Sequence, residues 1–186
     1  MGEEDDTELV RRWQSGDAGA FGTIVRRWQG PVARFFARLL GPDAAIADLT
    51  QDVFVRAHRG VGRYREAGTF STWLYRIALN IARDVARRAK RRPVPLPEEV
   101  PARAATVEDD WDRQELAIVV AEALAQLPDA LREVLVLRHY ENVNFENMSR
   151  LLGVPASTLK SRFAVALRRM RDLLIEHGYG DEGEVP

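Results

Sequence analysis

The chain has 186 residues, a formal net charge of -1, 46% hydrophobic and 30% charged residues, and no cysteine. It can bury the core of one domain or two small ones, and the missing cysteines exclude disulfides and thiolate metal sites. No apolar run approaches the roughly 20 residues that cross a bilayer, and the acidic start MGEEDDTELV lacks the apolar part of a secretory signal. We therefore expect a cytoplasmic protein with no membrane insertion.

The first part of the chain predicts helices. Apolar residues recur there at three- and four-residue steps, the period of a helix with one buried face. Helices are expected over residues 7–14, 18–28, 32–40 and 43–59. The strings SGD at 15–17 and GPD at 41–43 are firm breaks, whereas GP at 30–31 marks either a break or a helix start. A glycine-bounded loop is expected over residues 61–68.

Residues 68–92 are expected to form the main functional helix, which the rest of the chain supports. They read GTFSTWLYRIALNIARDVARRAKRR. One face is apolar and carries Phe70, Trp73, Leu74, Ile77, Ala78, Ile81 and Val85. A second face carries Thr69, Thr72, Arg76, Asn80, Arg83 and Arg87. These cations, hydroxyls and one amide are groups that bind phosphates and base edges, so the second face predicts contact with a nucleic-acid strand.

A linker and a second set of helices follow. Four prolines within residues 93–101 favour an extended segment, so residues 93–110 are expected to join two domains. Helices are expected over residues 111–126, 128–140, 145–152 and 156–175, and the end of the chain is expected to fray. No stretch alternates with a period of two. The expected fold class is all-α, with two small helical domains joined by a proline-rich acidic linker.

Charge is strongly segregated along the chain. Between residues 51 and 92, eleven Lys and Arg stand against three acids, and residues 98–115 hold seven acids against two arginines. A second basic cluster comprises Lys160, Arg162, Arg168, Arg169 and Arg171. Two basic surfaces separated by an acidic segment predict that the chain binds a polyanion at two places. The alternative is that these charge runs are only solvated helix faces.

The last two helices match the helix-turn-helix pattern, in which the second helix lies in the major groove. An exposed side is expected to carry Ser157, Lys160, Ser161, Ala164, Arg168 and Arg171. Serine and lysine can bond bases or phosphates, and alanine can touch a thymine methyl. The alternative to DNA binding is a plain helical hairpin.

Four sequence strings resemble conserved regions of bacterial sigma factors of the extracytoplasmic-function (ECF) group, in the sigma-70 family. The strings DLTQDVFVRA at 48–57 and TFSTWLYRIALN at 69–80 resemble the second region. The strings LPDALREVL at 127–135 and GVPASTLKSR at 153–162 resemble the fourth. Their order, their spacing and the proline-rich linker also match, and the resemblance covers residues 8–174.

The resemblance implies a transcription initiation factor that binds core RNA polymerase, directs it to promoters through −10 and −35 elements, and assists strand opening. Residues 1–92 would form a region 2-like domain for core polymerase and the −10 element, and 93–110 the linker. Residues 111–178 would form a region 4-like helix-turn-helix domain for the −35 element, followed by a tail at 179–186. The implied partners are core RNA polymerase, promoter DNA and an anti-sigma factor, with no cofactor.

The resemblance also assigns site residues. The face expected to dock on core polymerase comprises Asp48, Gln51, Asp52 and Arg56. The surface expected to take the −10 element as a single strand comprises Tyr64, Arg65, Tyr75, Arg76, Asn80, Arg83 and Arg87. The surface expected to read the −35 duplex comprises Ser157, Thr158, Lys160, Ser161, Arg162, Ala164 and Arg168. Tyr64 and Tyr75 could instead be core residues, and Asn80 a solvated amide.

The sequence departs from the family pattern at a few positions. His58 stands where an aromatic residue is common, and Asn144 and Asn147 replace small or acidic residues. Ala164 and Val165 stand where many relatives carry an aromatic residue or histidine and an arginine, so we expect fewer polar contacts to the −35 element.

Two other functions stay open from the sequence. One is an autonomous helix-turn-helix regulator of duplex DNA, and the other is a sigma mimic that sequesters an anti-sigma factor. An enzyme is not expected, because the chain holds no glycine-rich phosphate loop and no nucleophile elbow. A metal site is not expected, because His58, His139 and His177 lie far apart without a carboxylate at ligand spacing.

Overall fold

The computed structural model describes residues 5–42, 44–65, 69–91 and 111–179, and within these ranges every regular element is a helix. The first group comprises α1 (Asp6–Gln14), α2 (Ala18–Leu40), α3 (Ile46–Gly60), the 3-10 turn η1 (Val61–Arg63) and α4 (Phe70–Arg91). The second comprises α5 (Trp111–Gln126), α6 (Asp129–Leu135), the π turn η2 (Val136–Tyr140), α7 (Phe145–Leu152) and α8 (Ala156–Glu176). The expected all-α class with two helical domains is confirmed; the expected linker lies outside the described residues.

The first domain is built around aromatic and aliphatic side chains at helical spacing. Its fully buried side chains include Leu9, Val10, Ile24, Val32, Phe35, Phe36, Leu74 and Leu79. Each such side chain contributes about 1.5–3 kcal/mol by leaving water. They come from α1, α2 and α4, so these helices form one bundle, which α3 closes through its contacts with α2 and α4.

Helix α2 runs through Pro31 without a break, so the GP pair at 30–31 is neither a stop nor a start. A proline inside a helix removes one backbone hydrogen bond and costs roughly 3 kcal/mol. Ile24 lies before the proline and Val32 and Phe35 lie after it, and all three are 0% exposed. Packing on both sides therefore holds the helix together where local propensity would end it.

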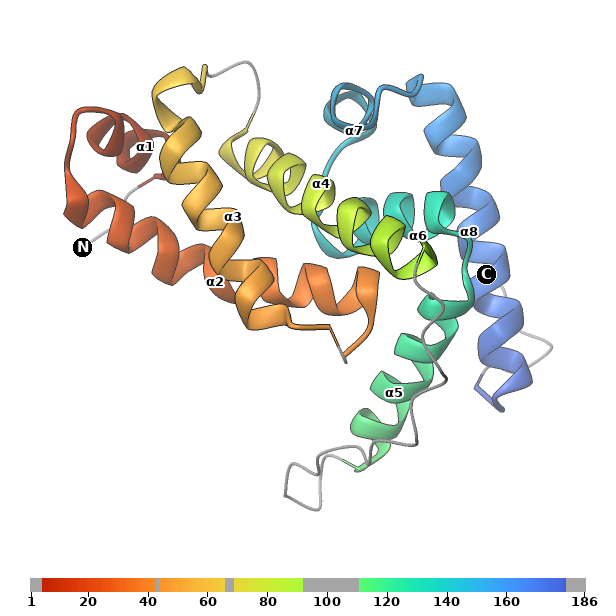
Figure 1. The fold of residues 1–186 in the computed structure, drawn as a ribbon. Coiled ribbons are helices and arrows are strands. Elements are labelled where there is room, and N and C mark those ends of the chain that lie inside the picture. The colour runs from red at the N-terminus through yellow and green to blue at the C-terminus, as the bar shows by residue number, and fades with distance from the viewer. Residues whose placement is uncertain (1–4, 43, 66–68, 92–110, 180–186) are drawn as a thin grey trace.

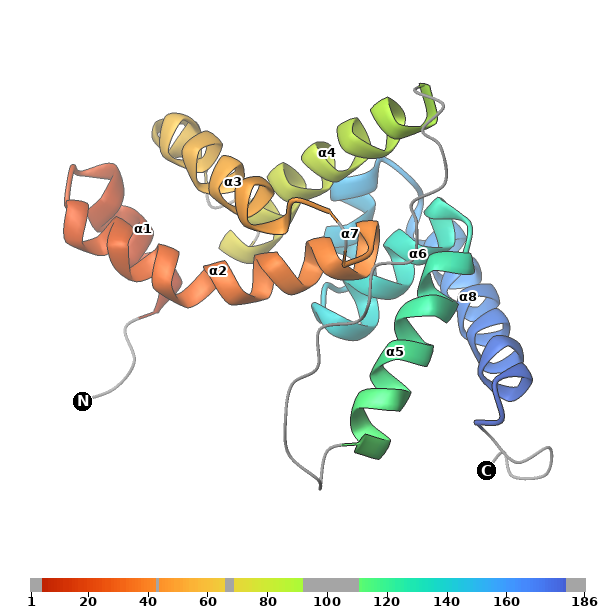
Figure 2. The ribbon, with the colours of Figure 1, turned by 60° about the horizontal axis from the view of Figure 1, so that its bottom comes forward.

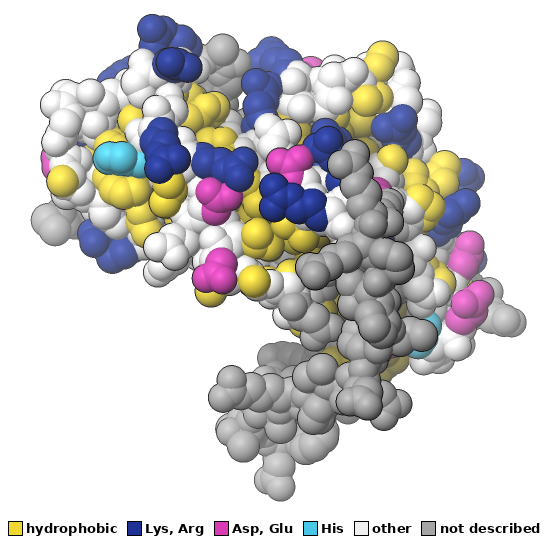
Figure 3. Space-filling view, viewed as in Figure 1, with side chains coloured by type: hydrophobic (Ala, Val, Ile, Leu, Met, Phe, Trp, Pro, Cys, Tyr) yellow, Lys and Arg dark blue, Asp and Glu magenta, His cyan; other side chains and the backbone are white. Residues whose placement is uncertain are grey.

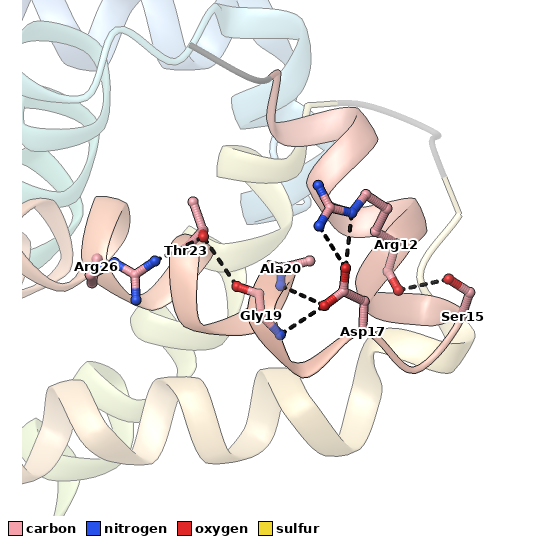
Figure 4. Close-up of polar contacts among 7 residues, drawn as sticks. All are labelled: Arg12, Ser15, Asp17, Gly19, Ala20, Thr23 and Arg26. Carbon is pink, nitrogen blue, oxygen red and sulfur yellow. Dashed lines mark hydrogen bonds and ion pairs between the residues drawn. The ribbon is translucent and has the colours of Figure 1, made fainter. Parts of the chain in front are cut away.

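The corner between α1 and α2 is set by Asp17 (Figure 4). Its Oδ1 accepts hydrogen bonds from the backbone N–H groups of Gly19 at 2.8 Å and Ala20 at 3.2 Å, which caps α2. Its Oδ2 accepts from Arg12 Nε at 2.9 Å and Nη2 at 2.6 Å. These bonds hold the pKa of Asp17 below its ordinary value, and the bond from Arg12 has the largest effect. Gly16 makes the turn possible with a φ of 98°.

The second domain contains the expected helix-turn-helix. Gly153 ends α7 in the left-handed region, at a φ of 69°, and α8 begins three residues later. Asn144 caps α7, because its side chain accepts a hydrogen bond from the Asn147 N–H at 2.8 Å. The asparagine that departs from the family pattern thus has a local structural role at the start of α7. Leu127, Leu137, Met148 and Leu159 are among the fully buried side chains of this domain.

Some details of the second domain differ from the sequence-based expectation. The helix expected over 128–140 widens into the π turn η2, which is followed by Asn142 at a φ of 52°. Leu116 and Leu167, whose apolar side chains favour burial, are 40% and 44% exposed. Leu116 lies on α5, which is apolar on several sides and packs mainly on α2 and α8, so part of its apolar surface is left uncovered.

The two domains pack against each other. Helix α4 lies between the first bundle and the second domain, with α6 and α7 beside it (Figure 1), and the turned view keeps this arrangement (Figure 2). Helix α4 contacts α7, while α2 contacts α5, α6 and η2. The surface expected to hold a nucleic-acid strand therefore borders the interface between the domains.

Candidate nucleic-acid interfaces

Helix α4 presents the expected row of polar side chains, with one exception. Arg76, Asn80 and Arg87 are exposed, and the Arg83 side chain is 40% exposed. Thr72 is buried, at 9% exposed, because its hydroxyl lies 2.8 Å from that of Thr69 at the start of the helix. The Thr69 hydroxyl also accepts a hydrogen bond from the Thr72 N–H at 3.3 Å. The expectation that Thr72 belongs to the outward polar face is wrong, since Thr69 caps α4 and the Thr72 hydroxyl bonds to Thr69.

A pocket opens beside this row, between the C-terminal end of α3 and the middle of α4. Its volume is about 320 Å³, and its lining comprises Arg56, Gly60, Arg63, Trp73, Ile77 and Asn80. Trp73, which the sequence placed on the apolar face, supplies a half-buried aromatic wall. Two guanidinium groups and an amide complete the lining, so the pocket combines a stacking face with donors for a base edge and a phosphate.

The two tyrosines expected at the −10 surface are buried in this arrangement. Tyr64 is 8% exposed, and its ring centroid lies 5.1 Å from that of Trp73. Tyr75 is 2% exposed, and its ring centroid lies 5.0 Å from that of Phe35 in the first core. Neither ring offers a free face here. Arg65 is exposed and donates to the Tyr64 carbonyl at 3.1 Å; residues 66–68 of the expected loop lie outside the described residues.

The residues assigned to core polymerase share one side of α3. Asp48, Gln51 and Arg56 are exposed, and Asp52 is half-buried. Arg56 donates to both carboxylate oxygens of Asp52, at 3.1 and 2.7 Å. Beside them a groove of about 720 Å³ runs between α2 and α3, and Thr50 lines it with a buried hydroxyl that has no partner among the described residues. The face thus combines exposed charges with an apolar groove.

The −35 set gathers on α8. Its exposed members are Ser157, Thr158, Lys160, Ser161, Ala164 and Arg168, and Arg162 is half-buried. The Lys160 ammonium lies 5.9 Å from the Phe145 ring centroid. Lys and Arg side chains recur along the upper face of the molecule, over α3 and α4 and again over the second domain (Figure 3).

Residues that the sequence did not single out join the two domains. Glu133 of α6 accepts two bonds from Arg83, at 2.8 Å from Nε and 2.6 Å from Nη2. Glu141, which follows η2, accepts from the Tyr75 hydroxyl and, at 3.2 Å, from Arg38. Of these two acids, only Glu133 lies in a string that the sequence analysis used. That string, residues 127–135, indicated the family and not a contact between the domains.

Further bonds between the domains end on backbone carbonyls. Arg76 donates to the carbonyl of Arg150 at 2.8 Å, and Arg132 to that of Leu39 at 2.8 Å. Arg38 also stacks over the Tyr140 ring, 4.1 Å from its centroid.

The ionisable groups at this interface have shifted pKa values. Burial raises the pKa of Glu141, and the Tyr75 hydroxyl and the Arg38 and Arg34 charges only partly offset it. Burial and the bond to Glu141 raise the pKa of Tyr75 as well. The bond to Glu133 raises the pKa of Arg83. The Arg83–Glu133 pair therefore favours its charged form, whereas Glu141 is disfavoured as a bare anion.

Within the described ranges, no three His, Asp or Glu side chains come together as a metal site would require. The same part of the chain contains no helix with the length and apolar character needed to span a membrane.

Comparisons with known proteins agree with the geometry. Residues 24–92 match the model of Sigma-70 region 2, and residues 118–170 match that of Sigma-70, region 4. The ECF RNA polymerase sigma factor SigM of Mycobacterium tuberculosis is 37% identical, covering 97% of this chain and 89% of that protein. The RNA polymerase sigma-H factor of Pseudomonas aeruginosa is 31% identical, covering 86% of this chain and 89% of that protein.

Solved structures show the same fold. CnrH in complex with the cytosolic domain of CnrY matches with a TM-score of 0.71 and 27% identity, covering 92% of this chain and 97% of that one. The sigma factor RpoE from Bartonella quintana, in complex with the anti-sigma factor NepR, matches with a TM-score of 0.65 and 20% identity. The match covers 83% of this chain and 96% of that one. From the family models and the curated relatives, the chain belongs to the ECF group of RNA polymerase sigma factors.

Proposed function

We propose that this sigma factor divides promoter recognition between its two domains. Residues 1–92 bind core RNA polymerase and take the −10 element, residues 111–178 read the −35 element, and residues 93–110 connect them. The chain acts as an initiation factor in the cytoplasm and catalyses no reaction of its own. The observation that carries the proposal is the row of exposed polar side chains on α4 beside a pocket with an aromatic wall.

The −10 element binds α4 as a separated strand. Arg76, Arg83 and Arg87 contact phosphates, and Asn80 contacts the edge of a base in the pocket against Trp73. Unstacking a base costs a few kcal/mol, and stacking on an aromatic side chain returns about 1–3 kcal/mol. Arg65 adds a cation at the loop, and Tyr64 supports the Trp73 wall from behind. Tyr75 contributes through its hydroxyl, since its ring belongs to the core.

The α3 face docks on core polymerase. Asp48 and Gln51 offer an acceptor and an amide, and the Asp52–Arg56 pair offers both charges in a fixed geometry. An exposed Val55, at 40%, lies on the same helix and lines the adjoining groove. A surface that mixes exposed apolar and charged groups is typical of a protein–protein interface.

Helix α8 reads the −35 duplex from the major groove. Ser157, Thr158 and Ser161 supply hydroxyls near its start, and Lys160 and Arg162 supply cations. Ala164 offers a methyl contact, and Arg168 reaches phosphate further along the groove. The small side chain at 164 supports a weaker sequence preference than an aromatic or histidine would provide.

An anti-sigma factor is the proposed protein partner besides core polymerase. Two proteins of the same fold were solved with a bound protein, the cytosolic domain of CnrY in one case and the anti-sigma factor NepR in the other. Such a partner should abolish transcription that depends on this chain.

The test is run-off transcription with purified core polymerase and a library of promoter fragments, followed by mapping of start sites. We expect initiation at defined sites only when this chain is present. Binding to duplex DNA without binding to core polymerase at low salt would instead identify an autonomous regulator. Binding to an anti-sigma factor without any initiation would identify a mimic.

A further inference from the structure

One wall of the pocket beside α4 is supplied by a short stretch of chain at the end of α3. Gly60 is the last residue of α3, and Arg63 belongs to the 3-10 turn η1 that follows; both line the pocket. In helices and 3-10 turns, side chains three positions apart lie on the same side. Residues 60 and 63 therefore share the side at the pocket, whereas residues 58, 61 and 64 share another side.

The N-terminal helix α1 holds that other side. It contacts η1 and lies beside the end of α3 (Figure 1). The Gln14 amide nitrogen, Nε2, donates hydrogen bonds to the backbone carbonyls of Val61 at 2.8 Å and Tyr64 at 3.1 Å. One residue earlier, Trp13 Nε1 donates to His58 Nδ1 at 3.2 Å. The last turn of α1 is thus bonded at all three positions on the side away from the pocket.

The Gln14 amide binds acceptors that the helix end leaves short of partners. The last carbonyls of a helix have no N–H group ahead of them within the helix. The Val61 carbonyl accepts from the Tyr64 N–H at 3.0 Å, which closes η1, and the Gln14 amide binds the same oxygen as a second donor. A single side chain therefore ties both ends of the turn together.

The backbone that carries this amide is fixed by the corner between α1 and α2 (Figure 4). After it, the Ser15 hydroxyl donates to the Arg12 carbonyl at 2.7 Å, and the Arg12 guanidinium binds the Asp17 carboxylate. Before it, Trp13 is 4% exposed and stacks on Phe21 with ring centroids 4.7 Å apart. The amide therefore reaches η1 from a well-supported position.

The position of η1 determines two walls of the pocket. Arg63 is exposed and supplies one of its guanidinium groups. Tyr64, which follows the turn, is buried and packs on Trp73 with ring centroids 5.1 Å apart. A shift of η1 would therefore displace a cation and the support of the aromatic wall together. A site binds its ligand most tightly when such groups are fixed before binding.

We propose that Gln14 is a positioning residue for strand binding, which acts through η1 and not through contact with DNA. Its amide fixes the turn so that Arg63 meets a strand phosphate while the adjoining base stacks on Trp73. The proposal rests on the strand-binding role assigned above to the pocket. It gives α1 a part in −10 recognition, although α1 supplies no residue to the pocket.

Gln14→Met tests the proposal in the full-length chain. Methionine has a similar length and no charge, but it cannot donate to the two carbonyls. Gln14 is exposed, so the change opens no cavity in the core, and the unfolding midpoint measured by circular dichroism should stay close to that of the unsubstituted chain. Gln126→Met makes the same chemical change at an exposed position of the second domain and is the matched control.

The first readout is the affinity for a mixed-sequence single-stranded DNA at low salt, measured by fluorescence anisotropy, beside the affinity for a mixed-sequence duplex. We expect Gln14→Met to weaken strand binding about fivefold, the effect of losing about one net hydrogen bond. Duplex binding should stay the same, and Gln126→Met should change neither. Strand affinity that is equal in Gln14→Met and Gln126→Met would overturn the proposal.

The second readout separates positioning from a general loss of structure. Arg63→Met removes the cation that η1 presents, and Arg87→Met removes an exposed cation further along α4, outside the pocket. In the Arg63→Met background, we expect Gln14→Met to lose at least half of its effect on strand affinity, whereas it should keep its full effect in the Arg87→Met background. Equal effects in the two backgrounds would exclude action through η1.

The third readout needs no DNA. The Tyr64 N–H closes η1, so its hydrogen exchange, measured by NMR, reports on the turn itself. We expect exchange about tenfold faster in Gln14→Met and unchanged in Gln126→Met. Exchange that stays the same in Gln14→Met would contradict the positioning role. If exchange becomes faster as expected but the unsubstituted chain binds no strand, the −10 assignment is wrong and the hold of Gln14 on η1 stands.

Discussion

Arg132 stabilises three chain segments with one guanidinium. It donates to the carbonyls of Leu124 at 2.7 Å, Ala125 at 2.7 Å and Leu127 at 2.8 Å, where α5 ends, and to Leu39 near the end of α2. The last carbonyls of a helix have no partner within it, and they carry partial negative charge. A planar group with five donors can satisfy several of them at once.

Removal of this group should therefore destabilise the fold and the contact between the domains. We expect Arg132→Met to lower the free energy of unfolding by about 3 kcal/mol, because buried carbonyls lose their donors. Arg132→Lys should recover only part of this loss, since an ammonium lacks the forked geometry. Urea denaturation followed by circular dichroism measures the effect. Arg169→Met, at an exposed position of α8, is the control, and an equal loss there would contradict the assignment.

A second prediction for a single side chain concerns Asn80. It is exposed, yet it lines the pocket that Trp73 walls, so its amide can meet a base that has left the stack. We expect Asn80→Ala to reduce open-complex formation about tenfold, the effect of losing one good base contact. Permanganate reactivity of promoter thymines measures opening, and pull-down measures core binding. Gln126→Ala removes an exposed amide from α5 and should change neither. Loss of core binding in Asn80→Ala would contradict the role.

At the scale of the element, the charge that α8 carries should appear in the salt dependence of duplex binding. Lys160 is exposed near the start of the helix, where a recognition helix meets DNA. We expect Lys160→Ala to weaken −35 binding and to reduce the slope of log affinity against log salt by about 1. Anisotropy over a salt series checks this. Arg26→Ala removes an exposed cation from α2, outside both basic clusters, and should leave the slope unchanged. A slope for Lys160→Ala equal to that of the unsubstituted chain would exclude the contact.

Helix α4 shows how far periodicity carries a prediction. Its span was expected over residues 68–92 and is Phe70–Arg91, because regular apolar spacing directly indicates a helix with one buried face. The assignment of Thr72 failed for a local reason, since a threonine near a helix start can bond the chain itself. Spacing identifies the buried side of a helix but does not indicate which polar group finds a partner nearby.

At the scale of the whole molecule, the contacts between the domains had no signal in the sequence. The partners Arg83 and Glu133 lie 50 residues apart, and Arg38 and Glu141 lie 103 apart. Arg83, Glu133 and Arg38 fit the polar sides of their own helices, and Glu141 follows η2, so a pattern within one helix reports neither pair. The −10, −35 and core surfaces could be assigned by resemblance, and those residue assignments stay predictions. The contacts that the second domain makes with Arg76 and Arg83 could be found only from the three-dimensional structure.

The titration of Glu141 gives a prediction for the packed molecule. The groups that face its carboxylate are the Tyr75 hydroxyl of α4 and the Arg34 and Arg38 charges of α2. Burial outweighs them and raises the pKa of Glu141 in the docked state above the ordinary value of 4.5 that it regains when the domains separate. A raised pKa means that the docked state binds the proton more tightly. Docking is therefore strongest below pH 4.5 and weakens as the pH rises through the raised pKa.

Because the chain has no cysteine, Arg59→Cys and Arg169→Cys allow one spin label at an exposed position of each domain. We expect the distribution of distances between these labels to broaden as the pH rises through this window. Glu141→Gln keeps an acceptor for Tyr75 and cannot ionise, so it should stay docked across the series and remove the pH dependence. Asp17, whose pKa is lowered from 3.8, titrates below the window and so leaves the corner of α1 and α2 unaffected. A wild-type distribution that does not change with pH, or a pH dependence that persists in Glu141→Gln, would show that another group controls docking.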